Sequence, residues 1–361
     1  TFTEMAPKAG CQITKFVKGV TSGDYDNDGL TDIFISTLNG DKILLKNESS
    51  KNGAVKFVDV TRQSGLSNNR ARTFPTWFWD YDNDGWLDIL VCGYEFTGSL
   101  AYYAAAEAIH APVDNAGKVF LFRNKHDGTF EDVSRKMGLN KIAFAMGSNF
   151  GDIDNDGYLD FYLGTGNPPF KSAVPNKLFK NMNGTGFLDV TSSARVGNLQ
   201  KGHAVSFADL NNDGNEDIYI KMGGAYAGDA YESSLFLNPG QNHNHWLNLL
   251  LTGTVSNRAA IGAKIKVTFN DGGTERSVYR DVNSGGSFGA NPLLQHIGLG
   301  QAGAVKEIEV RWPVTGHVQV FKNPPIDTNI KIKEDDSKLT TYQLARFNFI
   351  SEKSDDGMMH H

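Results

Sequence analysis

The sequence has few cysteines, no long apolar run and no surplus of positive charge, and each absence excludes a class of protein. Two cysteines among 361 residues, Cys11 and Cys92, cannot form a disulfide framework. Cys92 lies in a strand-like run, where we expect a buried thiol, and a bond to Cys11 is the alternative. No apolar stretch approaches the ~20 residues of a membrane-crossing helix, so we do not expect the chain to span a membrane.

Charge and motif content narrow the function further. The net charge is −6 and no basic stripe is present, so we do not expect binding to nucleic acid. The sequence contains no Gly-x-Ser-x-Gly elbow, no P-loop, no His-Glu-x-x-His and no cysteine cluster. We therefore predict no catalytic residue, and the sequence favours a protein that is not an enzyme.

What the sequence has instead is one nine-residue pattern, Asp-x-Asp-x-Asp-Gly-x-x-Asp, written four times. The copies are Asp24–Asp32, Asp80–Asp88, Asp152–Asp160 and Asp209–Asp217, the last with Asn211 at its third position. Oxygens at positions 1, 3, 5 and 9 and the carbonyl at position 7 surround one point, and the glycine at position 6 permits the sharp turn. An all-oxygen set of flexible geometry favours Ca²⁺, with Mg²⁺ as the weaker candidate.

The pattern therefore predicts up to four Ca²⁺ ions with five ligands each. The loops differ from an EF-hand because position 12 is apolar and β-rich sequence follows. The predicted ligands are Asp24, Asp26, Asp28, Leu30 and Asp32; Asp80, Asp82, Asp84, Trp86 and Asp88; Asp152, Asp154, Asp156, Tyr158 and Asp160; and Asp209, Asn211, Asp213, Asn215 and Asp217.

The repeats predict an all-β protein that begins with a β-propeller over residues 1–241. The loops recur every 56 to 72 residues, and each is flanked by β-like runs that give four strands per unit, which is one propeller blade. The fourth unit lacks its last strand, so we expect residues 2–5 to supply it and to close a ring of four blades. The alternatives are a fragment of a larger propeller or misjudged unit boundaries.

The repeat stops near residue 242, and the remaining sequence predicts a second domain. Seven alternating β segments with turn signals between them favour a β-sandwich over residues 242–334. We expect residues 335–361, which are polar and charged, to form a flexible tail.

Two sets of side chains outside the loops are further candidates. Aromatic residues in and beside an insert after the second loop are expected at the end of the propeller away from the calcium, either as a ligand face or packed onto the blades; they are Tyr94, Phe96, Tyr102, Tyr103, Phe170, Tyr226 and Tyr231. A second metal near the channel or the interdomain hinge would use His203, His243 and His245, whose alternative is ordinary packing.

These features resemble a known family. The loops and their flanking strands resemble the FG-GAP/VCBS repeats of integrin α-chain propellers. The phrases His245–Leu247, Asn257–Ala263, His296–Gly300 and Val310–Pro313 are similar to the ASPIC/UnbV domain. The two in this order are the arrangement of the cartilage acidic protein family, which implies a secreted or surface-exposed calcium-binding propeller with an appended β domain. Asn211 departs from the repeat pattern, and we expect a weaker fourth site.

The expected function is an extracellular propeller that recognises a protein or a glycan, with calcium in a structural role. Such sites suit compartments rich in calcium, so a secreted, cell-surface or periplasmic location is expected. The alternative is a secreted or secondary-metabolism enzyme that uses the second metal. A scaffold with further domains outside this sequence is a third possibility.

Overall fold

The computed structural model describes residues 2–349 except 51–52, 96–98, 110, 112–116, 167–173, 225, 229–230, 241, 284 and 347. The fold is all-β, as predicted, with three short α-helices and a 3₁₀ turn. The helices and the turn are α1 (Ala6–Ala9), η1 (Leu66–Asn68), α2 (Leu100–Ala108) and α3 (Thr191–Ala194).

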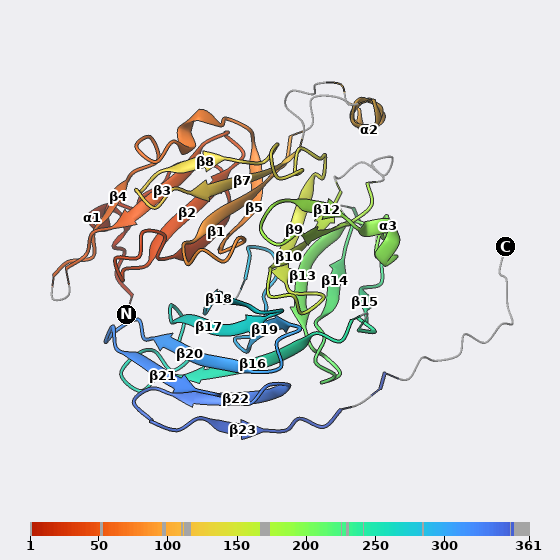
Figure 1. The fold of residues 1–361 in the computed structure, drawn as a ribbon. Coiled ribbons are helices and arrows are strands. Elements are labelled where there is room, and N and C mark those ends of the chain that lie inside the picture. Colours follow the sequence, from red (N-terminus) through yellow and green to blue (C-terminus); the bar gives the residue numbers. More distant parts are fainter. Residues whose placement is uncertain are drawn as a thin grey trace, which may run out of the picture.

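Four antiparallel sheets follow one another along an arc and form the blades (Figure 1). Blade 1 contains β1 (Val17–Gly23), β2 (Asp32–Thr37), β3 (Lys42–Asn47) and β4 (Phe57–Asp59). Blade 2 contains β5 (Thr73–Trp79), β6 (Asp88–Gly93), β7 (Val119–Asn124) and β8 (Phe130–Asp132). Blade 3 contains β9 (Ala145–Gly151), β10 (Asp160–Thr165), β11 (Lys177–Asn181) and β12 (Phe187–Asp189). Blade 4 has three strands, β13 (Gly202–Ala208), β14 (Asp217–Met222) and β15 (Ser234–Phe236).

The blades are held together by apolar side chains on both faces of each central sheet. Every residue of β5, β6 and β10 is buried, which is why these strands read as short continuous apolar runs instead of alternating ones. Between blades 2 and 3, Trp79 stacks on Phe187 at 5.7 Å between ring centroids and meets Phe161 edge-on. Aromatic pairs of this kind add to the burial term.

The predicted closure of the ring by residues 2–5 is wrong for this structure. These residues form no strand, and Phe2 is fully exposed. The following segment is fixed on blade 1, because Gly10 abuts the carbonyl of Phe57, and Cys11 and Ile13 pack on the Ile35 cluster. Four extended residues reach at most about 14 Å, whereas β15 lies at the other end of the arc (Figure 1).

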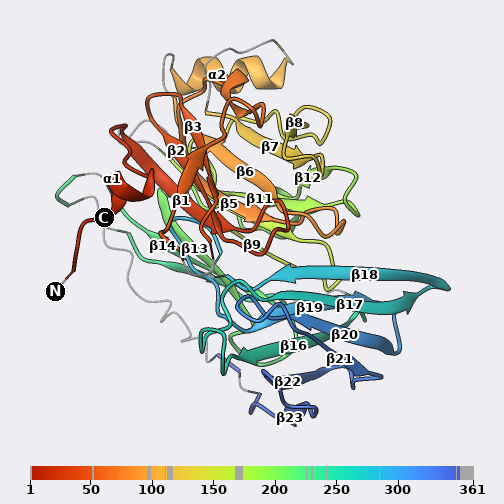
Figure 2. The same cartoon turned by 90° about the vertical axis from the view of Figure 1, so that its left-hand side faces the viewer.

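The C-terminal part is a sandwich of two four-stranded sheets below the blades (Figure 2). All seven predicted segments are strands: β16 (His245–Thr252), β17 (Lys264–Asp271), β18 (Thr274–Asp281), β19 (Gln295–Gly300), β20 (Val305–Arg311), β21 (Val318–Lys322) and β22 (Thr328–Lys333). The two sheets enclose one apolar core that includes Leu249, Ile265 and Trp312.

The segment expected as a flexible tail is partly ordered. An eighth strand, β23 (Thr340–Tyr342), pairs with β22, and the chain then runs back to the fourth Asp-rich loop. There Asn212 donates to the carbonyl of Ala345 at 2.8 Å, and Arg346 donates to the carbonyl of Asp213 at 2.6 Å. Residues 350–361 lie outside the described part. Cys11 and Cys92 are both free thiols, and Cys92 is buried as expected.

A loop of the sandwich occupies the inner side of the arc, where an open propeller would have its channel. Between β18 and β19, Gly286 donates to Asn149 Oδ1 at 3.2 Å, and Asn291 donates to the carbonyl of Phe150 at 2.7 Å. Asn291 Oδ1 also accepts the backbone N–H of Phe207 at 2.9 Å. Side chains of one domain therefore bridge the innermost strands of blades 3 and 4 in the other.

Glu334, just after β22, hydrogen-bonds to the loop that follows β16. Its buried carboxylate accepts the backbone N–H groups of Thr254, Val255 and Ser256 at 2.7–2.9 Å. Burial opposes its ionisation, but the hydrogen bonds from Ser256 and its neighbours outweigh burial and lower the pKa of Glu334 from 4.5 to about 2.

We predict that Glu334→Gln lowers the free energy of unfolding at neutral pH by about 2 kcal/mol, because charged hydrogen bonds are lost. A lowered folded pKa stabilises above pH 4.5, and this contribution is lost as the pH falls toward 2. Urea unfolding from pH 6 to pH 3 should therefore be less steeply pH-dependent in the variant. Glu275→Gln, at the exposed pair with Lys306, is the control; an equal effect there would contradict the assignment.

Candidate metal centres

The four Asp-rich segments, named metal loops 1 to 4 in chain order, each join the first and second strands of a blade. In loop 1 the carboxylate of Asp24 accepts the backbone N–H groups of Asp28 and Gly29 at 3.0 and 3.1 Å. Asp80, Asp152 and Asp209 make the same two bonds in the other loops. At position 4 each loop has an Asn with φ between 56° and 60°, a conformation that Asn tolerates well.

The Asp at position 9 ties each loop to the third strand of its blade. Asp32 is buried and accepts the backbone N–H groups of Tyr25 and Asn47 at 3.2 and 2.8 Å. The other three loops repeat this pair of bonds with Asp88, Asp160 and Asp217. Each loop is thus shaped by hydrogen bonds to carboxylates at both of its ends.

Loops 1 to 3 bring the carboxylates of positions 1, 3 and 9 together. In each of these three groups, one oxygen from every residue lies within 4.8 Å of the others. At position 3, one oxygen is buried and has no hydrogen-bond partner, and it is the same atom in all three loops: Oδ1 of Asp26, Asp82 and Asp154. A buried acceptor without a partner is costly, and an all-oxygen cluster around it fits a hard cation.

The predicted ligand at position 5 is arranged differently. Asp28, Asp84 and Asp156 lie outside the three clusters and accept the backbone N–H of position 7 at 2.8–3.0 Å. Asp84 also lies 2.9 Å from His126 Nε2, whose ring stacks on Trp86. Position 5 therefore shapes the turn in all three loops, and in loops 1 and 2 it also lies near a cation.

A side chain that the pattern did not include supplies that cation. The residue just before the Asn that ends strand three is Lys46, Arg123 or Lys180 in blades 1 to 3. Lys46 contacts Asp26 and lies 3.0 Å from Asp28, Arg123 lies 2.9 Å from Asp82, and Lys180 contacts Asp154. In each of these loops, this side chain therefore offsets part of the negative charge of the four carboxylates at the ligand positions.

Loop 4 differs from the other loops at both of these positions. Position 3 is the neutral Asn211, and the residue in place of the cation is Leu237. The ligand positions of loop 4 thus carry three carboxylates and no strand-three cation, while Glu216 at position 8 accepts the backbone N–H of Asp152 in loop 3 at 2.7 Å. Asn211 Oδ1 already accepts the backbone N–H of Asp213 at 3.1 Å, so loop 4 has no counterpart of the unpartnered oxygen.

The electrostatic state of the loops reflects this crowding. Burial first, and then repulsion from the neighbouring carboxylates, raises the pKa of Asp80 to about 8 and that of Asp32 to about 7. The same causes raise the pKa values of Asp88 and Asp160 well above the usual range. A bound divalent cation would remove the repulsion and favour the ionised carboxylates.

Asparagine side chains link successive loops around the arc. Position 4 of each of loops 1 to 3 donates to the position 6 carbonyl of the next loop: Asn27 to Gly85, Asn83 to Gly157 and Asn155 to Gly214, at 2.9–3.3 Å. The Asn at the end of strand three donates back to the preceding loop: Asn124 to Tyr25, Asn181 to Tyr81 and Asn238 to Ile153, at 2.6–2.8 Å. The geometry of one loop is therefore coupled to that of its neighbours.

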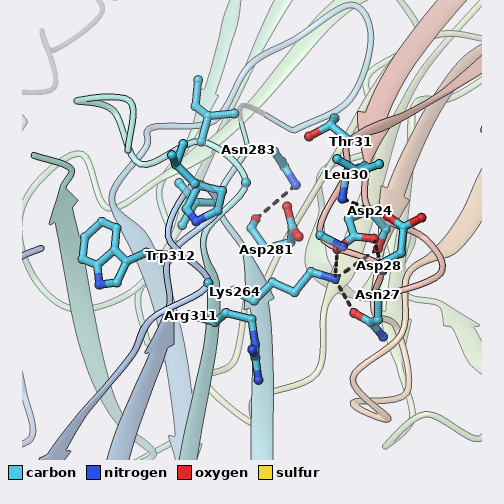
Figure 3. Close-up of a pocket in the computed structure, with 18 of the residues that line it drawn as sticks. Asp24, Asn27, Asp28, Leu30, Thr31, Lys264, Asp281, Asn283, Arg311 and Trp312 are labelled. Atoms are coloured by element: carbon cyan, nitrogen blue, oxygen red, sulfur yellow. Dashed lines mark hydrogen bonds and ion pairs between the residues drawn. The ribbon is translucent and has the colours of Figure 1, made fainter. Parts of the chain in front are cut away.

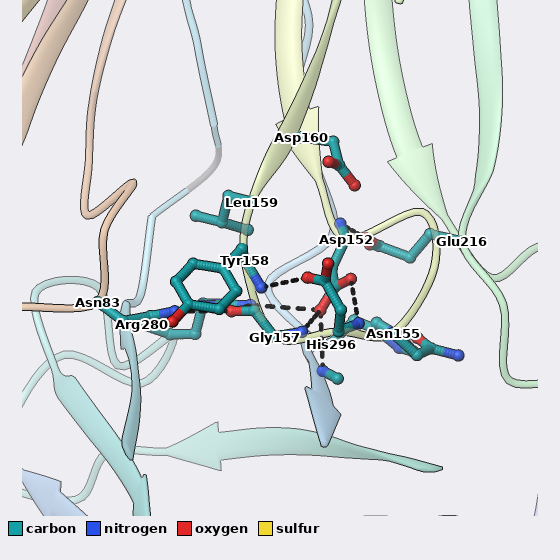
Figure 4. A network of polar contacts seen from close by, with 12 residues as sticks. Asn83, Asp152, Asn155, Gly157, Tyr158, Leu159, Asp160, Glu216, Arg280 and His296 are labelled. Atoms are coloured by element: carbon teal, nitrogen blue, oxygen red, sulfur yellow. Dashed lines mark hydrogen bonds and ion pairs between the residues drawn. The ribbon is translucent and has the colours of Figure 1, made fainter. Parts of the chain in front are cut away.

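The sandwich rests on the same loops, most closely on loop 3 (Figure 4). His296 Nε2 lies 2.5 Å from Asn155 Oδ1, and the backbone N–H of Gly298 donates to Asp152 at 3.2 Å. The buried Arg280 lies 3.8 Å from Asp152 and donates to the carbonyl of Gly157 at 3.3 Å. Burial, and then the charge of Arg280, lowers the pKa of His296 to about 3. His296 is therefore neutral, and its role is to hydrogen-bond the sandwich to loop 3.

A cavity of about 510 Å³ lies between loop 1 and the sandwich. Lys264 reaches across it to Asp24, with 2.9 Å between Nζ and Oδ2 (Figure 3). Asp281 lines the sandwich side, and burial, partly offset by Lys264, raises its pKa to about 7. The cavity thus borders the predicted ligands of loop 1.

The histidines proposed for a second metal have other surroundings. His245 Nδ1 lies 2.7 Å from Asp327, His243 is exposed, and His203 lies beside Gly223. Among the described residues, the groups with three convergent metal-ligand atoms consist of Asp alone.

The predicted aromatic ligand face is divided. Tyr102 and Tyr226 are exposed by 57% and 55%, whereas Tyr103 is buried against Phe144 and Tyr94 packs on Phe74. Tyr231 is half-buried at the edge of the blade 4 core. Phe96 and Phe170 lie outside the described residues.

Comparison with known sequences identifies both parts of the chain. A family model described as FG-GAP-like repeat matches residues 12–91 and 102–163, and a model described as ASPIC and UnbV matches residues 253–339. The chain carries FG-GAP-like repeats followed by an ASPIC/UnbV domain. The first model includes metal loops 1 to 3 and not loop 4, in keeping with the divergence of loop 4 at Asn211 and Leu237.

The chain is also similar to Cartilage acidic protein 1. Identity to the human protein is 28% over 231 residues, which is 63% of this chain and 30% of that protein. The mouse and Xenopus tropicalis proteins match at 27% and 26% over the same length. The matched region thus spans less than a third of these relatives, and their activities as whole proteins do not transfer directly.

Two solved structures align with the chain at low TM-scores. The Dos1 propeller aligns with a TM-score of 0.31 at 11% identity, over 91% of this chain and 66% of that chain. A sucrose-6-phosphate hydrolase from Lactobacillus gasseri aligns with a TM-score of 0.30 at 13% identity, over 85% and 75%. At these scores the likeness carries no argument.

We predict that loop 3 can be converted into loop 4. Asp154→Asn alone should destabilise the calcium-saturated protein, because Lys180 loses its partner. Combined with Lys180→Leu it should recover, with a coupling of at least about 1 kcal/mol in the free energy of unfolding. Chemical denaturation of the four proteins of this cycle gives the coupling.

The control is the same cycle at the exposed pair Glu275 and Lys306, where the expected coupling is below about 1 kcal/mol. Additive effects of Asp154→Asn and Lys180→Leu would contradict the charge balance.

Proposed function

We propose that the chain is a calcium-stabilised recognition module. The observation that carries this proposal is the unpartnered buried Oδ1 of Asp26, Asp82 and Asp154, repeated at one position in three loops. A turn that recurs by chance with solvated carboxylates has no reason to bury the same atom each time. Ligation would come from the Asp residues at positions 1, 3 and 9, supported by the Asp at position 5 and the carbonyl at position 7.

Calcium in this role holds the fold and takes no part in chemistry. Each ion would cross-link the first two strands of its blade and offset two of the negative charges of the loop. The Asn links between loops and the contacts of Arg280 and His296 with loop 3 would carry that order to the neighbouring blade and to the sandwich. Loop 4 would hold its ion more weakly, because Asn211 is neutral and its Oδ1 is already used.

The recognition surface would lie at the end of the blades away from the loops, since the sandwich covers part of the loop end. The insert with α2 lies there (Figure 1), and exposed tyrosines such as Tyr102 are suited to contacts with a protein or a glycan. We propose an extracellular or periplasmic location, where calcium is plentiful. No helix in the described residues is long and apolar enough to cross a membrane.

We predict that excess calcium raises the melting temperature of the chelator-treated protein by at least about 5 °C, because ligands that bind only the folded state stabilise it by mass action. Magnesium at the same concentration should give a smaller rise. Differential scanning calorimetry measures both. A transition that is the same in calcium and in chelator would rule out the structural role.

We predict that the metal-free protein becomes less stable as the pH rises from 6 to 8. The folded pKa values of Asp32 and Asp80 lie near 7 and 8, above the usual 3.8, so the folded state binds more protons than the unfolded state in this window. Stability then falls with pH, and the contribution is complete only below pH 3.8. Calcium should abolish the dependence; urea unfolding at four pH values, with and without calcium, tests this.

The recognition role predicts a partner that binds in calcium and is lost in chelator. An array of glycans and extracellular proteins, probed in both conditions, gives the partner. Tyr102→Ala combined with Tyr226→Ala should then weaken binding at least about tenfold, whereas Val314→Ala, at an exposed site on the sandwich, should not. If no array component binds, the recognition role is contradicted. If the double variant binds as tightly as the parent protein, the assignment of the binding surface to Tyr102 and Tyr226 is contradicted.

A further inference from the structure

Among the described residues, nothing covers the outer face of blade 4 in the way that the outer faces of blades 1 to 3 are covered. In every blade, one residue of strand two lies directly opposite one of strand three: Phe34 with Leu44, Leu90 with Leu121, Tyr162 with Leu178, and Tyr219 with Leu235. In blades 1 to 3 both members are at most 2% exposed, but Tyr219 is 42% and Leu235 is 37% exposed.

The repeats show what covers this pair. In blade 3, Tyr162 and Leu178 pack against Val205 of the next blade and against Val196 of the turn before it. Leu66 and Leu139 take the place of Val196 between the earlier blades. The cover is therefore the first strand of a following blade together with the turn that precedes that strand.

The N-terminal segment has the sequence and the local structure of such a turn. Phe2-Thr3-Glu4-Met5 follows the Phe-x-Asp-Val pattern of β4, β8 and β12, and Cys11 follows Gly10 as Leu66 follows Gly65. In the three fourth strands the acidic residue accepts the N–H two residues later, at 3.0–3.1 Å. Glu4 does the same to Ala6 at 2.7 Å, although residues 2–5 pair with no strand.

The segment cannot reach blade 4 of its own chain, because the residues that follow it are fixed on blade 1 at the other end of the arc. Blade 4 in turn ends at β15, whose outer edge has no partner among the described residues. Within the described part of the chain, residues 2–5 thus pair with no strand, and blade 4 has no fourth strand.

We propose that a second copy of this chain fills the gap in head-to-tail fashion, with its residues 2–5 as the fourth strand of blade 4. The register follows from the pairs Lys46 with Val58 and Lys180 with Leu188: Thr3 lies opposite Leu237, and Glu4 opposite Phe236. Val20 of the second copy, 51% exposed in one chain, takes the place that Val205 has against blade 3 and covers Tyr219 and Leu235.

The contact is smaller than the contacts between blades within one chain. Ser22 stands on β1 where Phe78, Phe150 and Phe207 stand on the first strands of the other blades, so one aromatic side chain is missing from it. A head-to-tail contact uses different surfaces on the two copies and extends to further copies unless the rotation closes a ring. Association is therefore reversible, and the associated fraction of the protein rises with protein concentration.

Sedimentation velocity in saturating calcium tests the association. The protein should associate over micromolar to millimolar concentrations. Tyr219→Lys, and separately deletion of residues 1–5, should each weaken association at least about tenfold without lowering the melting temperature. Val255→Lys, at an exposed site on the sandwich, should leave association unchanged. A protein that stays monomeric throughout, or variants that associate like the parent, would overturn the proposal.

Disulfide trapping tests the register. In a Cys11→Ser background, one protein carries Thr3→Cys and another carries Leu237→Cys; mixed and oxidised, they should form a covalent heterodimer. Leu237→Cys replaced by Ser234→Cys, three residues out of register, should give at least about tenfold less product. Absence of the heterodimer would overturn the proposal. So would an internal disulfide in a monomer that carries Thr3→Cys and Leu237→Cys together.

Discussion

The structure depends on one electrostatic constraint: carboxylates crowded into a nine-residue turn and partly removed from water. Water cannot screen them there, so the chain must neutralise them or leave them protonated. Blades 1 to 3 place one Lys or Arg against position 3, and blade 4 has neither that acid nor that base. In every loop the carboxylates at the ligand positions outnumber the neighbouring cations, and a divalent cation would offset that excess.

The crowded carboxylates lie where the blades contact one another and the sandwich. The Asp residues at positions 1 and 9 bind backbone N–H groups, so the carboxylates that would hold the ion also set the path of the chain. Asparagines then connect each loop to the next, and the sandwich inserts Arg280, His296 and Lys264 at the same end. Loss of order in one loop would therefore loosen a blade, its neighbour and the interdomain contact together.

Much of this architecture was predictable from the sequence. The periodic loops and their apolar flanks located the strands of all four blades, and alternation with turn signals located seven strands of the sandwich, because both patterns reflect local burial. The failure of residues 2–5 to close the ring was not predictable, because it depends on where Gly10 and Cys11 pack on blade 1. In loops 1 to 3 the carboxylates of positions 1, 3 and 9 converge, whereas position 5 binds the backbone N–H of position 7; ligation of an ion stays a prediction.

The sequence did not predict which side chains connect the loops to one another and to the sandwich. Lys46, Arg123 and Lys180 could have been noticed, because each precedes the Asn that ends strand three. Nothing in the sequence reveals that Asn83 and Asn155 bridge to the next loop, since that needs the angle between blades. The split between exposed Tyr102 and buried Tyr103 likewise follows from how α2 lies on the blades.

The most direct test of the central claim is the number of calcium ions bound per chain, measured by isothermal titration calorimetry of the metal-free protein and checked by elemental analysis after dialysis. The account predicts three sites of similar affinity in loops 1 to 3 and a weaker fourth in loop 4. Binding of no calcium, or of one ion outside these loops, would contradict it.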